Sequence, residues 1–360
     1  MRVLMIEDEP KFVAAVKAVF ESANDATLLM ATDIGVADEF NRDGNESIEE
    51  QLAGRLSRVA AEHKIDLVLL DTDLSREAKF QTQTVYRQAF RQIGLPVCRY
   101  RKKARETLAH NFELIYRLAT DGATAVSVPH EAVVDDGPEN CLVDWLKAVS
   151  AGFQALRDEL QRRPELLTTT LGPAGILAGL LGRPELHPDL LGYTAPNFFF
   201  FASDGGKAGQ DVHDYATSLG YWLVNYILAF PGPILHKAAT AAYLNITVDS
   251  LDRPGVLQLL EPAMYAGPFA SLDGGHYWLN DLADLIEKWG GDIRQAPELK
   301  EVRLDQVDAG PRAQAFFCIV NKQPIPASEA ASSPDWIPSG AQMARIRQDD
   351  LEQLGPMLNI

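Results

Sequence analysis

Residues 66–71, with the sequence Asp-Leu-Val-Leu-Leu-Asp, decide the fold of the first third of this chain. Four consecutive apolar residues between two carboxylates are typical of a strand buried on both faces of a parallel sheet. A second apolar run, residues 2–6, ends in the same way, because Glu7 and Asp8 follow it directly. Parallel sheets carry their sites at the carboxyl ends of the strands. The two runs therefore predict an acidic site that includes Glu7, Asp8 and Asp71.

Strand and helix patterns alternate on both sides of these two runs. We expect strands at 2–6, 27–31, 66–71, 95–100 and 123–128, and helices at 11–22, 51–62, 82–92 and 104–119. Such alternation predicts an α/β fold with a doubly wound, five-stranded parallel sheet. Residues 33–50 are polar and acidic, and they predict a loop insertion after the second strand.

Residues 139–163 predict one long helix with a heptad pattern. Its apolar residues alternate at spacings of four and three, which is typical of a coiled-coil seam. They are Leu142, Leu146, Val149, Phe153, Leu156 and Leu160. We expect the first half of the helix to pack on the sheet and the second half to link domains or to pair two copies in a homodimer. Pro164 ends the pattern.

The chain of 360 residues is therefore predicted to have three parts. An α/β domain covers 1–138, an extended linking or dimerisation helix covers 139–163, and a mostly α-helical second domain with a few strands covers 164–360. Within the last part, residues 302–307 and 313–320 are the expected strands.

Charge and cysteine usage exclude several classes of protein. The net charge is -17, and we expect no nucleic-acid partner, because such proteins neutralise phosphates with a basic face. Three widely separated cysteines without CxxC spacing favour a reducing, cytoplasmic setting. The most apolar stretch, 221–235, is interrupted by Asn225, Pro231 and Pro233, so we expect a buried segment and no membrane span.

Several stretches resemble the receiver domains of bacterial response regulators. Residues 3–10 are similar to the opening of those domains, and residues 67–75 are similar to their phosphoacceptor strand and loop. Residues 94–97 and 122–129 resemble the regions of the fourth and fifth strands. The resemblance covers a little over a third of the chain. It implies a flavodoxin-like strand order and the five-strand fold of a receiver.

The resemblance also implies a set of site residues. Asp71 would be the phosphoacceptor, and Glu7, Asp8 and Asp71 would be carboxylate ligands of Mg²⁺, a hard cation that prefers oxygen. The backbone carbonyl of Asp73 would be a further ligand.

The chain departs from the receiver pattern at two places. Receivers carry Ser or Thr after the fourth strand, where this chain has Tyr100 or Arg101. They also carry Lys before the proline that follows the fifth strand, where this chain has Val128. A basic residue after the fourth strand would have to contact the phosphoryl group instead. The candidates are Arg101, Lys102 and Lys103.

These features predict a two-component-type response regulator, a signalling protein more than an enzyme. Asp71 would accept a phosphoryl group from a sensor kinase or another signalling protein. The second domain would be a protein-interaction, output or sensor module. One alternative is a pseudo-receiver scaffold that signals without phosphorylation. Another is a metal-dependent phosphohydrolase in the second domain, because His213 and Asp214 form a His-Asp pair, with His187 upstream.

Overall fold

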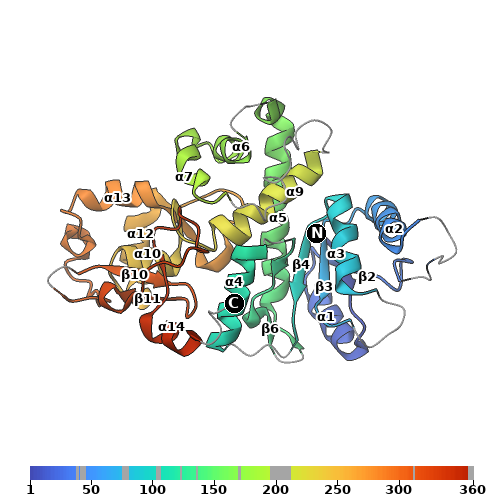
Figure 1. Ribbon diagram of the computed structural model, residues 1–360, viewed down its shortest axis with the longest axis horizontal. Coiled ribbons are helices and arrows are strands. Elements are labelled where there is room, and N and C mark those ends of the chain that lie inside the picture. Colours follow the sequence, from blue (N-terminus) through green and yellow to red (C-terminus); the bar gives the residue numbers. More distant parts are fainter. Residues whose placement is uncertain are drawn as a thin grey trace. The chain divides into compact units, whose positions relative to one another are not determined.

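The computed structural model describes residues 1–37, 40, 46–74, 81–102, 107–121, 124–134, 137–168, 172–194, 212–310 and 313–355 (Figure 1). Backbone contacts group the chain into two compact units. The first unit is built from 1–105, 123–168 and 205–221, and the second from 106–122, 169–204 and 222–360.

The first unit contains a five-stranded parallel sheet, as the alternating pattern predicts. Its strands are β1 (Arg2–Ile6), β2 (Thr27–Met30), β3 (Leu67–Asp71), β4 (Val97–Tyr100) and β5 (Val126–Ser127). Their order is β2-β1-β3-β4-β5, and every neighbouring pair is parallel. The doubly wound α/β fold is thereby confirmed. A short hairpin of β6 (Val133–Val134) and β7 (Gly137–Pro138) follows β5.

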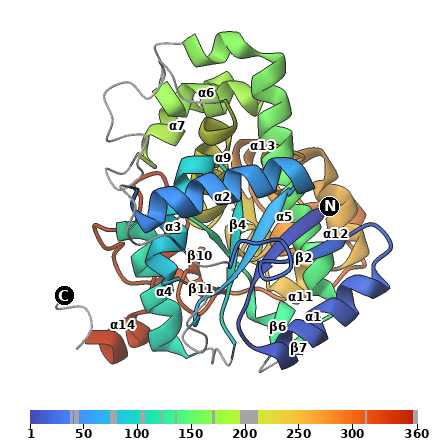
Figure 2. The same cartoon turned by 90° about the vertical axis from the view of Figure 1, so that its right-hand side faces the viewer.

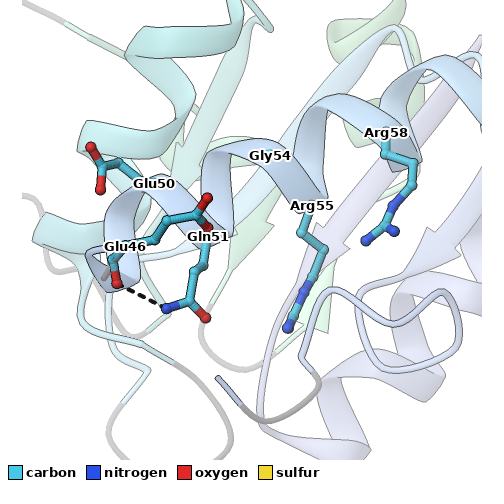
Figure 3. Close-up of a pocket in the computed structure, with 6 residues that line it drawn as sticks. All are labelled: Glu46, Glu50, Gln51, Gly54, Arg55 and Arg58. Carbon is cyan, nitrogen blue, oxygen red and sulfur yellow. Dashed lines mark hydrogen bonds between the residues drawn. The ribbon is translucent and has the colours of Figure 1, made fainter. Parts of the chain in front are cut away.

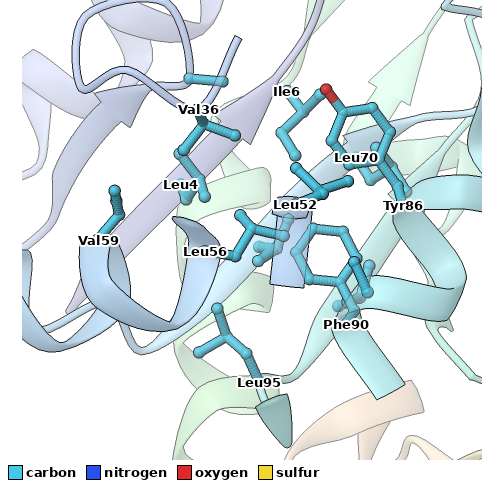
Figure 4. Packing of buried hydrophobic residues seen from close by; sticks show 14 of the residues in the cluster. Leu4, Ile6, Val36, Leu52, Leu56, Val59, Leu70, Tyr86, Phe90 and Leu95 are labelled. Carbon is cyan, nitrogen blue, oxygen red and sulfur yellow. The ribbon is translucent and has the colours of Figure 1, made fainter. Parts of the chain in front are cut away.

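Helices α2 (Ile48–His63) and α3 (Gln83–Ile93) cover one face of this sheet (Figures 1 and 2). Helix α2 begins in a capping box of Ser47 and Glu50, in which each side chain binds the other residue's backbone N–H. Alternate strand residues point towards these helices because side chains alternate across a strand. The side chains of the resulting cluster are buried and pack against one another (Figure 4). It includes Leu4, Ile6, Val68 and Leu70 from the strands and Leu52, Leu56, Tyr86 and Phe90 from the helices.

Helix α1 (Pro10–Ser22) lies on the opposite face of the sheet. Its Phe12 ring stacks on Tyr100 of β4, with 5.1 Å between ring centroids. Tyr100 and Cys98 point away from the α2 and α3 face, since Val97 belongs to the cluster on that face. The first turn of α1 is thus fixed beside the carboxyl end of β4.

Helix α5 (Cys141–Arg162) carries the heptad seam. The six seam residues are at most 1% exposed. Part of this cover comes from α9 (Val212–Trp222), whose Tyr221 ring meets Phe153 edge to face at 5.2 Å. The Gly94 carbonyl accepts hydrogen bonds from Arg157 of α5 (3.0 Å) and Thr217 of α9 (2.6 Å). The Tyr221 hydroxyl is 2.7 Å from the Val97 nitrogen. The seam is therefore buried within one chain, and a homodimer through 139–163 stays a prediction.

The second unit is mostly helical, as predicted. Its helices include α4 (Leu108–Asp121), α6 (Gly172–Leu180), α7 (His187–Leu191), α10 (Lys237–Tyr243), α11 (Val248–Leu251), α12 (Pro254–Leu260), α13 (Leu279–Glu287) and α14 (Gln348–Leu354). Its strands are β8 (Ile234–His236), β9 (His276–Trp278), β10 (Ala315–Cys318), β11 (Gln323–Pro326) and β12 (Ala344–Arg345). No helix in the described ranges has the length and apolar character needed to cross a membrane.

Of the two strands expected in the second unit, one is present and one is not. Strand β10 lies within the expected range 313–320. The expectation at 302–307 is wrong, since that stretch contributes only an isolated bridge between Gln306 and Ile246. Asp305, in the middle of this stretch, instead forms ion pairs with Arg253 and Arg303.

Three backbone segments cross closely within the second unit. The Gly340 N–H donates to the Gly192 carbonyl at 3.1 Å, and a Cβ at Gly192 would lie 2.6 Å from the Gly340 nitrogen. A Cβ at Gly232 would overlap the Gly340 carbonyl oxygen and the Tyr193 hydroxyl. Only residues without a side chain allow backbones to approach this closely. The same C-terminal segment places Trp336 edge-on against Phe112 and Tyr116 of α4.

We expect His236→Asn to make the second unit less sensitive to acid. The ring Nδ1 of His236 accepts the Ala239 N–H (3.4 Å) at the start of α10. Burial, with His276 and Lys322 nearby, lowers the pKa of His236 from 6.5 to about 3. A lowered histidine pKa means that the unfolded chain binds the proton first, so stability is complete above pH 6.5 and falls towards pH 3.

The expected loss attributable to His236 is about 3 kcal/mol between pH 7 and pH 4. Asparagine keeps an acceptor at the helix start and does not titrate. Urea unfolding followed by tryptophan fluorescence at the two pH values measures the difference. Equal pH dependence in the wild type and the variant would show that His236 does not titrate in this range.

Candidate functional site

The acidic site lies at the carboxyl edge of the sheet, where β1 and β3 end side by side. Ile6 pairs with Leu70 in the parallel register, so the residues that follow β1 reach the level of Asp71. Glu7, Asp8 and Asp71 are 3%, 5% and 0% exposed, and one ligand oxygen from each lies within 4.8 Å of the others. Within the described ranges this is the only group of three such side chains. The structure therefore brings together the three carboxylates that the sequence singles out.

Lys102 supplies the positive charge of this site. Its ammonium Nζ lies 2.8 Å from Glu7 Oε1, 2.9 Å from Asp71 Oδ2 and 3.2 Å from Glu9 Oε2. It follows β4 by two residues, and β4 pairs with β3 so that Tyr100 stands beside Asp71. The lysine side chain is 10% exposed. A basic residue after the fourth strand thus contacts the carboxylate that the sequence assigns as phosphoacceptor.

Tyr100 and Phe12 form the inner wall of the site. The Tyr100 hydroxyl donates a hydrogen bond to Glu7 Oε2. The Phe12 ring stacks on Tyr100, and the Lys102 ammonium lies 5.3 Å from the Phe12 ring centroid. A cation over an aromatic face is attracted by the electron-rich ring. Phe12, Glu9 and the contact made by Tyr100 are not among the site residues predicted from the sequence. The period of two along β4, which turns Tyr100 towards the α1 face, is the signal for the tyrosine.

Backbone N–H groups hold the carboxylates in position. Glu7 Oε1 accepts from the N–H groups of Asp8 (2.9 Å) and Glu9 (2.7 Å). Asp71 Oδ1 accepts from the Asp73 N–H at 3.1 Å. The Asp73 side chain itself is exposed. The role predicted for Asp73, which is that of its backbone carbonyl, stays a prediction.

Burial dominates the electrostatics of the acidic site. Burial raises the pKa of Glu7, while hydrogen bonds from Lys102 and Tyr100 oppose this rise. Burial likewise raises the pKa of Asp71, and Lys102 again opposes it. The pKa of Lys102 is raised, because its bonds to Glu7 and Asp71 outweigh the effect of burial. Burial and the nearby carboxylates raise the pKa of Tyr100, so the phenol keeps its proton and its hydroxyl donates a hydrogen bond to Glu7. The positive charge of Lys102 therefore stabilises the ionised forms of Glu7 and Asp71 in this buried site.

The donor set of this site suits a hard divalent cation. Buried carboxylate oxygens from Glu7, Asp8 and Asp71 are the ligands that Mg²⁺ prefers, and they converge at one edge. The Lys102 ammonium shows that the same oxygens stabilise a positive charge. Asp71 is also a potential nucleophile, since carboxylates form covalent intermediates in phosphoryl transfer.

None of the other predicted residues that the structure describes belongs to the group of three carboxylates. Arg101 is exposed, and Lys103 falls outside the described residues. His187 begins α7 in the second unit, whereas His213 and Asp214 are in the part of α9 that belongs to the first unit. These three do not form a metal-ligating group among the described residues. The phosphohydrolase alternative therefore gains no support from the described part of the chain.

An open depression lies along α2 and the residue Glu46 that precedes it (Figure 3). It is lined by Glu46, Glu50, Gln51, Gly54, Arg55 and Arg58. Two of these residues have structural tasks. Glu50 closes the capping box of α2, and Arg55 donates to the Val36 carbonyl (3.2 Å) while lying over the Phe40 ring (4.3 Å). No group of metal-ligating side chains in the described ranges includes these residues.

Comparison of the chain with protein-family models, curated proteins and solved structures finds no match. The fold and the acidic site thus stand on the chain's own geometry. That geometry is an N-terminal five-stranded parallel sheet with a cluster of Glu7, Asp8 and Asp71 at its carboxyl edge, which is compatible with a receiver-like fold.

Proposed function

We propose that the first unit is a receiver-like signalling module in which Asp71 accepts a phosphoryl group. The observation that carries the proposal is the contact between Lys102 and Asp71 inside a buried carboxylate cluster. Lys102 holds two fully buried carboxylates, Glu7 and Asp71, together with the partly exposed Glu9. Such an arrangement is costly for stability, because each buried charge costs several kcal/mol. A cluster of this kind is therefore a candidate for function.

The reaction would form a bond between an Asp71 carboxylate oxygen and the phosphorus of a small acyl phosphate or a phosphorylated kinase. The bond between phosphorus and the donor's leaving atom breaks, and that atom departs with the electron pair. The product on the protein is an acyl phosphate. Mg²⁺ held by Glu7, Asp8 and Asp71 would neutralise charge on the transferring group.

The chain's own residues would position and stabilise the phosphoryl group. The Asp73 N–H holds Asp71 Oδ1, which leaves Oδ2 as the oxygen that faces Lys102. The Lys102 ammonium can follow the charge from the carboxylate to a phosphoryl oxygen, since it sits on a flexible four-carbon chain. Tyr100 keeps Glu7 in place through its hydroxyl. In this proposal Lys102 takes the part that receivers give to a lysine after the fifth strand.

The second unit would be the output or interaction module. Helix α9 begins in the first unit and its last residue, Trp222, belongs to the second. In the first unit, Thr217 and Tyr221 of α9 contact Gly94 and Val97 at the start of β4, the strand that ends at Tyr100. A change at the acidic site could therefore bias α9, provided that the two states differ in affinity for a signal.

Intact-mass spectrometry after incubation with acetyl phosphate and Mg²⁺ tests the proposal. We expect the wild type to gain the mass of one HPO₃ group and Asp71→Asn to gain none. Asp144→Asn is the matched control, because its side chain is 83% exposed on α5 and lies outside the group of three carboxylates. Labelling of Asp71→Asn to the wild-type level would refute phosphoacceptance at Asp71.

A second candidate function is a pseudo-receiver that signals by binding and is never phosphorylated. The observation that favours it is that the Lys102 ammonium contacts both Glu7 and Asp71, the carboxylates that a metal and a phosphoryl group would need. No adduct on the wild type with acetyl phosphate or with a panel of sensor kinases would support this alternative.

A further inference from the structure

Lys102 contacts two of the three carboxylates that a divalent cation at the acidic site would need. Glu7 Oε1 and Asp71 Oδ2 both lie within 2.9 Å of its Nζ, and Glu9 Oε2 follows at 3.2 Å. The other Glu7 oxygen accepts the Tyr100 hydroxyl, and the other Asp71 oxygen accepts the Asp73 N–H. The oxygens of Glu7 and Asp71 are therefore already engaged while Lys102 is in place.

We propose that Lys102 is a built-in competitor of the divalent cation, so that metal binding requires the ammonium to leave the carboxylates. The proposal rests on the metal-binding half of the proposed function and does not depend on phosphorylation. It makes Lys102 the residue that sets the metal affinity of this site.

Charge and space both argue for competition. An ammonium and a divalent cation that share Glu7 and Asp71 would repel each other at short range in a poorly solvated site. The Lys102 side chain is only 10% exposed, and it is confined between the carboxylates and the Phe12 ring. Water cannot screen the repulsion well in such a place. The lysine must therefore move outwards, which its long side chain permits.

The competition has a functional meaning for the site. With Lys102 in place, a positive charge already contacts the oxygens of Glu7 and Asp71, and metal at low concentration would bind weakly. With the metal bound, the ammonium is released and becomes available to a phosphoryl oxygen. Metal occupancy would thus determine where the Lys102 ammonium lies. Lys102 is the one cation with a described contact to Asp71.

Isothermal titration of Mn²⁺ into full-length protein is the first test. We expect Lys102→Met to bind Mn²⁺ about tenfold more tightly than the wild type, or about 1.4 kcal/mol. Arg101→Met is the matched control, because it removes the same charge from an exposed neighbour and should change the Kd little. An equal or weaker affinity in Lys102→Met, an equal gain in Arg101→Met, or no Mn²⁺ binding by any variant would each overturn the proposal.

Lysine footprinting is the second test, and it observes the displacement directly. Brief treatment of the wild type with an amine-acetylating reagent, followed by peptide mass spectrometry, reports the accessibility of Lys102. We expect saturating Mg²⁺ to increase acetylation of Lys102 and to leave the half-exposed Lys17 unchanged. Unchanged protection of Lys102 at saturating Mg²⁺ would overturn the proposal. A failure of phosphoacceptance alone would alter the HPO₃ adduct and neither of these readouts.

Discussion

Lys102→Met is expected to lower the free energy of unfolding of the first unit by about 3 kcal/mol at neutral pH without metal. The substitution keeps the length of the side chain but leaves Glu7, Glu9 and Asp71 without the ammonium that contacts all three. Breaking a buried ion pair from one side is costly because the remaining charges stay desolvated. Hydrogen exchange of the β1, β3 and β4 peptides across a urea series measures this loss within the first unit.

The loss should depend on pH with a definite sign. Burial already raises the pKa of Glu7 and Asp71, and without Lys102 nothing of comparable strength opposes it. Groups with a raised carboxyl pKa favour the folded state at low pH, and this contribution disappears as the pH rises through the folded pKa. The variant should therefore approach wild-type stability towards pH 4. A deficit that is the same at pH 4 and pH 7 would mean that lost packing, and not charge, explains it.

Gly232→Ala is expected to destabilise the second unit by about 3 kcal/mol or more. The new methyl group would overlap the backbone oxygen of Gly340 and the hydroxyl of Tyr193. Neither group can move easily. The Gly340 N–H is hydrogen-bonded to the Gly192 carbonyl, and the Tyr193 hydroxyl donates to the Phe230 carbonyl at 2.7 Å. A fall in the urea midpoint, followed by fluorescence of the buried Trp222, is the expected result.

Gly255→Ala provides the comparison for this prediction. A Cβ at Gly255 would meet its nearest atom, from Leu299, at an ordinary contact distance of 3.5 Å. Because Gly255 is in helix α12, alanine should be neutral or stabilising by up to about 1 kcal/mol. Equal losses of stability in the two variants would show that the backbones at Gly232 have room for a methyl group.

The sheet and its carboxylates could be predicted from the sequence because local rules govern them. Apolar runs of strand length place Glu7 and Asp71 at strand ends, and parallel pairing then brings the ends together. The choice of Lys102 from three basic neighbours could not be predicted. It depends on how the chain leaves β4 after Tyr100, and a single residue of difference reverses the direction of a side chain.

The second unit was predicted only in outline, since its contacts join residues that are far apart in the chain. The close approach of Gly192, Gly232 and Gly340 is an example, because each glycine alone resembles an ordinary turn residue. The burial of the heptad seam is another. A spacing of four and three identifies an apolar face, but it does not tell whether α9 or a second copy of the chain covers Phe153.

The division of each unit among three separate segments has a consequence for biosynthesis. The first unit ends with residues 205–221, which the ribosome makes after 169–204 of the second unit. Until Thr217 and Tyr221 have emerged, their hydrogen bonds to the Gly94 carbonyl and at the Val97 nitrogen cannot form. Domains usually fold in the order in which they are synthesised. Here the contacts of α9 with Gly94 and Val97 can form only after part of the second unit has been made. An early stop or a truncation near residue 163 would yield a first unit that lacks α9.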